Sequence, residues 1–257
     1  MVGGTRVLEL RRLDAGPCRL FAKLEMDNPG GSIKDRIAVR MIEQAEQDGA
    51  LRPGGGLIEA TAGNTGLGLA LVAALKGYRV TVVVPDKMSL EKIDHLRALG
   101  AEVVVTRSDV GKGHPEHYQD VAERLSRESG AFFVNQFANE ANADAHYETT
   151  GPEIWEQLGG DVDAAVFAVG TGGTLTGTSR LLREHNPDLE IVLADPLGSV
   201  LAPLVETGEM IEPGSWLTEG IGEDFVPPVL DLDLVTKTYT IDDEEAFRTA
   251  RMLLRSE

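Results

Sequence analysis

The chain has 257 residues, 42% of them hydrophobic, so it is long enough to bury one large core or two smaller ones. Its 24 lysines and arginines face 42 aspartates and glutamates, and the net charge of −18 excludes nucleic acid as a partner, because no segregated basic patch is visible. No apolar run approaches the roughly 18 residues of a membrane span, and residues 1–9 lack the core of a signal peptide. We therefore expect a cytoplasmic globular protein that binds no membrane. The single cysteine, Cys18, excludes an internal disulfide and a cysteine-cluster metal site.

Short apolar runs alternate with helical patterns, which predicts an α/β fold with largely parallel sheets flanked by helices. After a first strand at 20–24, the runs occupy residues 57–60, 80–84, 103–105, 132–134, 164–169 and 191–194. Several runs are solid rather than alternating, as expected for strands buried on both faces. The helical patterns at 33–47, 65–76 and 89–99 end at Gly49, Gly77 and Gly100, where left-handed caps belong. The last helix opens at Asp242 with Glu245 three residues on, as in a capping box.

A polar stretch at 139–144 follows one of these strands and predicts a domain boundary. We expect an N-terminal α/β domain at 1–140, with residues 1–35 able to cross to the other domain, and a C-terminal α/β domain at 141–257. Ligands of open parallel sheets bind at the carboxyl ends of the strands. The loops at those ends are therefore the places to look for chemistry.

The first such motif is Asn-Pro-Gly-Gly-Ser-Ile-Lys-Asp-Arg at 28–36, a turn-prone stretch in which Ser32 and Asp35 have capping-box spacing. Lys34 falls in the first helical turn, where the helix dipole disfavours a cation. A lysine that is easily deprotonated is suited to Schiff-base formation. The neighbouring Asp35 opposes this effect, and a solvated surface lysine is the alternative. The glycine spacing excludes a P-loop.

Two further motifs each lie between a strand and a helix. Residues 61–66, Thr-Ala-Gly-Asn-Thr-Gly, offer free amides to a carboxylate or phosphate, or form only a tight turn. Residues 170–174, Gly-Thr-Gly-Gly-Thr, suit a phosphate held without lysine or arginine, which fits an acidic chain. A nicotinamide enzyme is the alternative, since Asp86 lies about twenty residues past Gly66, near the position of a ribose-binding acid. The segment 219–222 between helix and strand is a candidate substrate lid.

Taken together, these segments resemble the pyridoxal-phosphate (PLP) enzymes of the tryptophan-synthase-β-like fold, in particular the cystathionine β-synthase and cysteine synthase branch. The match runs in register over nearly the whole chain. The resemblance implies two open, mostly parallel twisted sheets with PLP in the cleft between them. It also implies that Lys34 carries PLP as a Schiff base and then, as the freed amine, removes the α-proton of an amino acid. Loss of the β-substituent and attack by a thiol would complete a β-replacement.

The resemblance assigns roles to individual residues. The implied cofactor-binding residues are Lys34, Asn64, Gly170, Thr171, Gly172, Gly173 and Thr174. The implied substrate-binding residues are Thr61, Ala62, Gly63, Asn64, Thr65, Gln136, Gly220 and Ile221. Amino acids and thiols are the implied small-molecule partners, and a homodimer is the implied assembly. No metal and no haem are expected, because the Cys and His ligands of the haem-bearing members have no counterpart.

Within the branch, three segments favour cystathionine β-synthase, acting on L-serine and homocysteine: residues 85–92, 195–199 and 219–231. Residues 151–155, Gly-Pro-Glu-Ile-Trp, are more similar to cysteine synthase, which uses O-acetylserine and sulfide. Two departures affect specificity. Ala62 stands where the family commonly has serine, and Glu223 stands where many cystathionine synthases carry tyrosine. The last helix keeps its apolar pattern to residue 257 without a glycine cap, so we expect the C-terminal domain to be incomplete.

Overall fold

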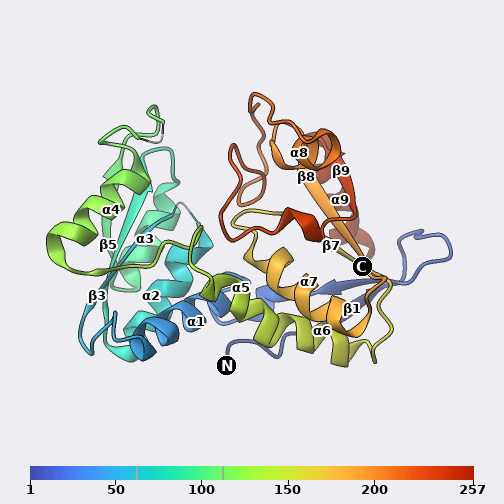
Figure 1. The fold of residues 1–257 in the computed structure, drawn as a ribbon, viewed down its shortest axis with the longest axis horizontal. Helices are drawn as coiled ribbons and strands as arrows, with labels where there is room; N and C mark the ends of the chain where they lie inside the picture. The colour runs from blue at the N-terminus through green and yellow to red at the C-terminus, as the bar shows by residue number, and fades with distance from the viewer. Residues whose placement is uncertain (62, 112) are drawn as a thin grey trace. The chain divides into compact units, whose positions relative to one another are not determined.

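The computed structural model describes residues 1–61, 63–111 and 113–257, and the chain divides into two compact units (Figure 1). Unit 1 comprises Met1–Gly3 and Glu25–Asn142, and unit 2 comprises Gly4–Leu24 and Ala143–Glu257. Each unit contains a parallel sheet with helices packed against it. The α/β fold class expected from the sequence is thereby confirmed.

Unit 1 is built on a four-stranded sheet in the order β5-β4-β3-β6, in which all pairs are parallel. Its elements are η1 (Glu25–Asp27), α1 (Lys34–Gln47), β3 (Gly56–Ala60), α2 (Asn64–Lys76), β4 (Arg79–Pro85), α3 (Leu90–Ala98), β5 (Glu102–Thr106), α4 (Tyr118–Ser129) and β6 (Phe132–Phe133). The central strands β3 and β4 are almost entirely buried. This explains their solid apolar runs, because helices cover both faces.

The two faces of the β3–β4 pair are covered by different helices. Ile58 and Ala60 pack in one cluster with Val121 and Ala122 of α4. Successive strand residues point to opposite faces. Glu59 and its register partner Val82 therefore face the other side, where a Cβ added to Gly66 of α2 would lie 3.2 Å from Val82 Cγ1. Glu59 is thus a carboxyl group on the face that α2 covers.

Unit 2 contains an antiparallel pair, β1 (Val7–Leu10) with β2 (Leu20–Lys23), and a parallel sheet in the order β7-β8-β9. Its other elements are α5 (Ala141–Ala145, which spans the boundary), the π-helical turn η2 (His146–Thr150), α6 (Gly151–Gln157), β7 (Ala164–Phe167), α7 (Gly173–His185), β8 (Glu190–Pro196), α8 (Leu201–Thr207), η3 (Leu232–Leu234), β9 (Lys237–Ile241) and α9 (Asp243–Ser256). None of the helices described is long and apolar enough to cross a bilayer.

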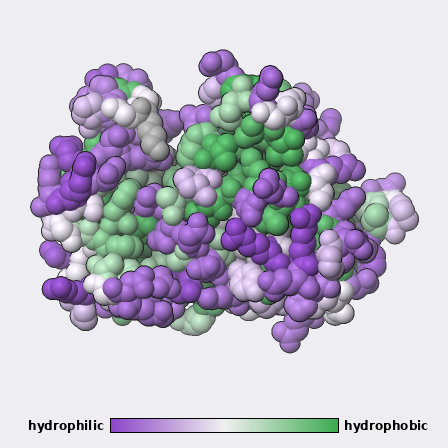
Figure 2. Space-filling model, viewed as in Figure 1, coloured by the Kyte–Doolittle hydropathy of each residue, from purple (hydrophilic) through white to green (hydrophobic). Residues whose placement is uncertain are grey.

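The core of unit 2 lies on one face of its parallel sheet. Leu175 and Leu182 of α7 pack with Ile191 and Leu193 of β8. On β7 the alternate residues point the other way, and Val166 is 63% exposed. Figure 2 shows hydrophobic residues gathered over the part of unit 2 that carries α8 and β8. β7 is therefore covered on one face only by the residues that the structure describes.

The helix ends test the local predictions directly. Gly49, Gly77 and Gly100 all have positive φ, between 71° and 88°, so the left-handed caps are confirmed. Asp242 Oδ1 accepts a hydrogen bond from the Glu245 amide at 2.8 Å, which confirms the cap of the last helix. The capping box at Ser32 is wrong. Helix α1 begins after Ile33 with no side-chain cap, because the Asp35 carboxylate turns back to the Gly30 amide instead.

Candidate active site

Lys34 is the first residue of α1, as the sequence predicts, and its amide donates to Ser32 Oγ at 3.2 Å. Asp35 beside it is fully buried, and its carboxylate accepts from the Gly30 amide. Burial raises the pKa of Asp35 above its ordinary value, although the Gly30 hydrogen bond acts in the opposite direction. Asp35 is therefore turned inward, toward the turn at 28–31, and its negative charge is disfavoured.

Helix α2 crosses α1 at the residue that carries the candidate Schiff-base lysine. A Cβ added to Gly68 would lie 3.1 Å from the Lys34 carbonyl oxygen, so glycine permits this close approach. Asn64 lies one turn before Gly68 on α2, and residues four apart share a helix face. The crossing thus places the starts of α1 and α2, with Lys34 and Asn64, in one region of unit 1.

Thr61 and Gly63 lie between β3 and α2, at the carboxyl end of the strand. Thr61 still pairs with the sheet, since its amide donates to the Val83 carbonyl at 3.1 Å. Its hydroxyl accepts from the Gly63 amide at 3.1 Å, and no side chain caps α2. The first amides of a helix have no acceptor within it, so they are suited to an anion. Ala62, which was assigned to the substrate site, lies outside the described residues.

Thr65 and Gln136 are far apart in the sequence and in contact in the structure. The Thr65 hydroxyl donates to Gln136 Oε1 at 2.6 Å, and both side chains are buried. The Gln136 amide donates to Glu59 Oε2 at 3.1 Å, and its carbonyl accepts from Asn142 Nδ2 at 2.8 Å. Four buried polar side chains therefore form one network behind the loop.

Glu59 is the unexpected member of this network. It is 1% exposed, and its Oε1 accepts from the Ala60 amide at 2.8 Å. Burial raises the pKa of Glu59 to about 8, although hydrogen bonds from the Gln136 and Ala60 amides lower it. No charged side chain contributes to this change in pKa. Burial therefore favours the protonated form of this carboxyl group.

The glycine-rich loop of unit 2 is shaped by close packing. A Cβ on Gly170 would lie 2.6 Å from the Gly220 carbonyl oxygen, and one on Gly172 would lie 2.5 Å from Leu230 Cβ. Gly172 also has φ of 90°, a conformation that only glycine adopts readily. Neither position has room for a larger residue, so the loop can pack this closely only with glycine at both positions.

The cradle formed by residues 170–174 fits a phosphate group. Gly172 is the residue before α7, no side chain caps that helix, and its first amides point out of its amino end. Thr171 is buried and Thr174 is half-buried, and the Thr174 hydroxyl lies 3.2 Å from Nε2 of buried His146. The other ring nitrogen of His146 contacts Thr150 Oγ1 at 2.8 Å. The donors present, amides and hydroxyls, are those a phosphate monoester requires.

Gly220 and Ile221 lie beside this cradle on a segment that is fixed at its backbone. The Gly222 amide donates to the Val169 carbonyl at 2.7 Å, and Trp216 Nε1 donates to the Ile221 carbonyl at 2.8 Å. Ser199 Oγ accepts from the Glu223 amide at 3.1 Å. In this structure the segment is therefore held against Val169 and Ser199, and the substrate lid expected from the sequence stays a prediction.

The predicted site residues divide between the units. Unit 1 contains Lys34, Thr61, Gly63, Asn64, Thr65 and Gln136, whereas unit 2 contains Gly170, Thr171, Gly172, Gly173, Thr174, Gly220 and Ile221. Sequence reasoning missed Glu59, Asn142, His146 and Ser199, which hold these residues in place. A glutamate inside an apolar strand was a visible indication for Glu59. The other three have no distinguishing pattern.

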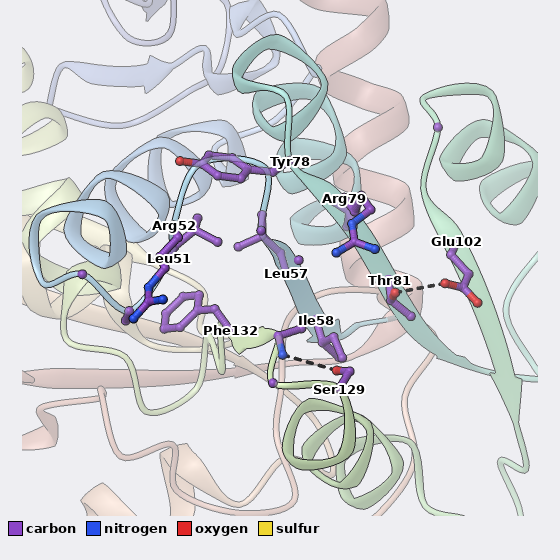
Figure 3. A pocket seen from close by; sticks show the side chains of 18 residues that line it. Leu51, Arg52, Leu57, Ile58, Tyr78, Arg79, Thr81, Glu102, Ser129 and Phe132 are labelled. Atoms are coloured by element: carbon purple, nitrogen blue, oxygen red, sulfur yellow. Dashed lines mark hydrogen bonds between the residues drawn. The ribbon is translucent and has the colours of Figure 1, made fainter.

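A cavity of about 880 Å³ lies at the amino ends of the unit 1 strands, opposite the end that carries the candidate site (Figure 3). It is lined by residues at the amino ends of the strands, including Leu57, Arg79 and Glu102, and by the ends of the preceding helices. Among the predicted site residues that the structure describes, none lines it. Ligands of parallel sheets bind at the carboxyl ends, so this cavity is not the candidate site.

Comparisons with known proteins agree with this geometry. The profile of the family described as pyridoxal-phosphate dependent enzyme matches residues 1–257. Cystathionine beta-synthase of Oryctolagus cuniculus is 47% identical over 260 residues, covering 100% of this chain and 47% of that protein. Cysteine synthase A of Escherichia coli is 43% identical over 259 residues, covering 100% of this chain and 79% of that protein. A solved structure of O-ureido-L-serine synthase superposes with a TM-score of 0.91 at 35% identity, covering 100% of this chain and 78% of that one.

The chain spans about half the length of the cystathionine beta-synthases that it matches. Its match to cysteine synthase A covers most of both proteins. The nicotinamide alternative is thereby removed, and in the structure Asp86 accepts a hydrogen bond from the Ser108 amide at 3.1 Å. On the full-length profile match and these identities, the chain belongs to the family of pyridoxal-phosphate-dependent enzymes.

Proposed function

We propose that this protein performs a PLP-dependent β-replacement on L-serine, in which homocysteine displaces the hydroxyl group and cystathionine is formed. The observation that carries the choice of substrate is the packing of unit 2. The segments 195–199 and 219–225, which favour cystathionine β-synthase by resemblance, are joined through Ser199 and Glu223. The Gly222 amide then binds Val169, directly before the phosphate cradle. The segments that favour cystathionine β-synthase by resemblance are therefore linked, through Gly222, to the strand end that precedes the proposed cradle.

Lys34 is proposed to hold the cofactor covalently through Nζ and later to take the α-proton of the substrate. Its place at the start of α1 supports the second role, because the helix dipole favours the neutral amine over the ammonium. When bound, PLP supplies an electron sink for the bond that breaks at the α-carbon. The protein's part is to position the amino acid and to exchange protons at Nζ.

The remaining roles follow from the donors at hand. The Thr61 hydroxyl, the Asn64 and Thr65 amides at the start of α2, and the Asn64 and Gln136 side chains are proposed to bind the substrate carboxylate and to orient the cofactor. Gly63 and the Thr65 hydroxyl would hold the loop in shape, because their hydrogens go to Thr61 Oγ1 and Gln136 Oε1. The residues from Gly170 to Thr174 are proposed to bind the phosphate. Neither set includes lysine or arginine, so each binds its anion with oriented dipoles rather than formal charge.

The second candidate function is cysteine synthesis from O-acetylserine and sulfide. It is favoured by residues 151–155, which resemble cysteine synthase. These residues lie in α6. A Cβ on Gly151 would lie 2.7 Å from Leu181 Cδ2 of α7, so the segment packs directly on the helix that follows the cradle. The sequence identities to cystathionine beta-synthases and to cysteine synthases overlap, so identity does not discriminate between the two functions.

The deciding experiment combines two donors with two thiols. Protein loaded with PLP is incubated with L-serine or O-acetylserine, each with homocysteine or sulfide, and the products are identified by mass spectrometry. Cystathionine from serine is the expected main product. Cysteine formed from sulfide at an equal or higher rate would reverse the assignment.

Cofactor attachment is tested separately. Borohydride reduction should leave a stable adduct on the peptide containing Lys34, and Lys34→Ala should lack both the adduct and the visible absorption band. Lys76→Ala, at the end of α2, is the matched control and should retain both. An adduct absent from the wild-type protein would refute the enzyme function as a whole.

The assembly and location are also proposals that rest on the resemblance. We infer a homodimer in the cytoplasm, with amino acids and thiols as its small-molecule partners. Light scattering during gel filtration gives the mass directly. A mass equal to that of one chain would exclude the dimer.

A further inference from the structure

The segment before Gln136 leaves the sheet abruptly. The pairing of β3 with β6 ends at Ile58 and Phe133, after which only the Val134 amide reaches the Ile58 carbonyl, at 2.9 Å. Asn135 then has φ of 50°, the only positive value among the described residues other than glycine. At this point the Ala60 amide has no neighbouring strand to donate to, and the chain turns toward α2.

Glu59 fills the gap that β6 leaves. One oxygen of its carboxyl group accepts from the Ala60 amide at 2.8 Å and the other accepts from the Gln136 amide at 3.1 Å. A glutamine side chain has one acceptor oxygen and an NH₂ group that only donates. It would therefore leave one of the two buried amides without an acceptor, which is costly. The geometry requires a carboxyl group at position 59.

Gln136 is consequently held at three atoms. Glu59 binds its amide, Asn142 binds its carbonyl, and the Thr65 hydroxyl binds Oε1. Within residues 1–61, 63–111 and 113–257, Gln136 Nε2 has no hydrogen-bond acceptor. The two Nε2 hydrogens are thus the donors left for a ligand, and their direction is set by the other three contacts.

We propose that Glu59 is a positioning residue for amino-acid binding: by fixing the Gln136 backbone, it lets Thr65 orient the side-chain amide so that Nε2 donates to the substrate carboxylate. This inference rests on the proposed function, because it assumes that the loop after β3 is the amino-acid site. Glu59 does not contact the substrate itself and acts through Gln136.

The test is a double-mutant cycle on protein loaded with PLP. Glu59→Gln, Gln136→Ala and the double variant are titrated with L-serine, and the change in the visible absorption of the cofactor gives Kd. Each single variant should raise Kd about tenfold, as expected for one lost hydrogen bond to a charged group, with an unchanged cofactor band. The double variant should bind no more weakly than Gln136→Ala, because both changes remove the same interaction.

The matched control is Glu102→Gln on β5, whose exposed carboxylate accepts from Thr81 Oγ1 at 3.3 Å. Its Kd should equal that of the wild type. If the effects of Glu59→Gln and Gln136→Ala multiply, Glu59 supports the fold in general and the positioning role is overturned. In steady-state rates, Glu59→Gln should raise KM for serine and leave kcat nearly unchanged.

A second measurement needs no variant and stands even if Glu59→Gln fails to fold. Hydrogen exchange of the wild-type protein should show the Gln136 amide protected by at least about a hundredfold over its unfolded-chain rate. Exchange at the unfolded rate would show that the Glu59 contact is absent, and the inference would fall. If the wild-type protein takes up no PLP, both the proposed function and this inference are overturned. If the wild-type protein binds serine and Glu59→Gln binds it with the same Kd, only this inference is overturned.

Discussion

The two candidate anion loops share one topology and are held in different ways. Each follows a parallel strand and precedes a helix, the first at Thr61 in unit 1 and the second at Gly170 in unit 2. The first is backed by hydrogen-bonding side chains, among them Glu59 and Gln136. The second is shaped by Gly170 and Gly172, which admit no side chain, and its Thr174 contacts the ring of buried His146.

This difference predicts which kind of change should weaken each loop. The stability of a loop held by hydrogen bonds should change with pH, because those bonds depend on whether a buried carboxyl group is protonated. A support made by close packing responds to added volume and is indifferent to pH. The following predictions test that contrast, beginning with the largest expected effect.

The pH dependence of stability should reflect Glu59. Its pKa rises from 4.5 to about 8 on folding, so the fold favours the protonated form. The resulting stability is fully present below pH 4.5 and is lost as the pH rises through about 8, on the order of 4 kcal/mol. The raised pKa values of Asp35 and Asp195 act in the same direction.

The measurement is the free energy of unfolding in guanidinium chloride at several pH values between 5 and 8. The wild-type value should fall across this range, and Glu59→Gln should give a flatter curve even where its absolute stability is lower. A wild-type protein that becomes more stable toward pH 8 would contradict the assignment.

The glycine cradle should be sensitive to size instead. Gly172→Ala introduces a Cβ 2.5 Å from Leu230 Cβ at φ of 90°, and we expect a loss of about 3 kcal/mol from strain and overpacking. Gly159→Ala is the matched control, because this glycine also has positive φ, at 65°, but has no atom within 4 Å of an added Cβ. It should cost only about 1 kcal/mol. Equal losses would show that backbone strain alone, and not packing, shapes the cradle.

Two hydroxyl deletions should separate substrate binding from cofactor retention. Thr65→Val removes the donor to Gln136, so serine binding should weaken about tenfold while PLP remains bound. Thr174→Val removes a hydroxyl from the cradle, so PLP should dissociate about tenfold more readily on dialysis. Titration with serine, followed by the cofactor's visible absorption, measures the first effect. The visible absorption that remains after dialysis measures the second. If Thr65→Val loses the cofactor instead, the division of roles between the loops is wrong.

The sequence predicted the fold class and the local structure of the loops because these depend on short-range patterns. Solid apolar runs identified β3 and β4, and glycines at 49, 77 and 100 identified helix ends. The order β5-β4-β3-β6 depends on which strands pair across the chain, and no local pattern encodes it. The short strand β9 was missed, since its residues are mostly exposed.

The supporting residues were harder to predict than the loops they support. Lys34 and the residues from Gly170 to Thr174 belong to contiguous motifs, whereas His146 meets Thr174 across 28 positions and Asn142 meets Gln136 only after a turn. The Ser32 capping box failed because the Asp35 carboxylate had a nearer donor, the Gly30 amide. A competing hydrogen bond of this kind is decided by the three-dimensional turn and not by spacing.

The smallest expected effect concerns Glu223, whose Oε1 lies 4.0 Å from the position of a Cβ on Gly170. A carboxylate beside the cradle should repel an approaching anionic thiol, and solvent weakens that repulsion. Glu223→Gln should therefore raise kcat/KM for hydrosulfide about threefold at low ionic strength, with a smaller gain at high salt. Asp224→Asn is the matched control, because it removes the same charge from the next, exposed position. Initial rates at two salt concentrations decide the matter: equal gains in the two variants would mean that net charge, and not the place of Glu223 beside Gly170, governs access of the thiol.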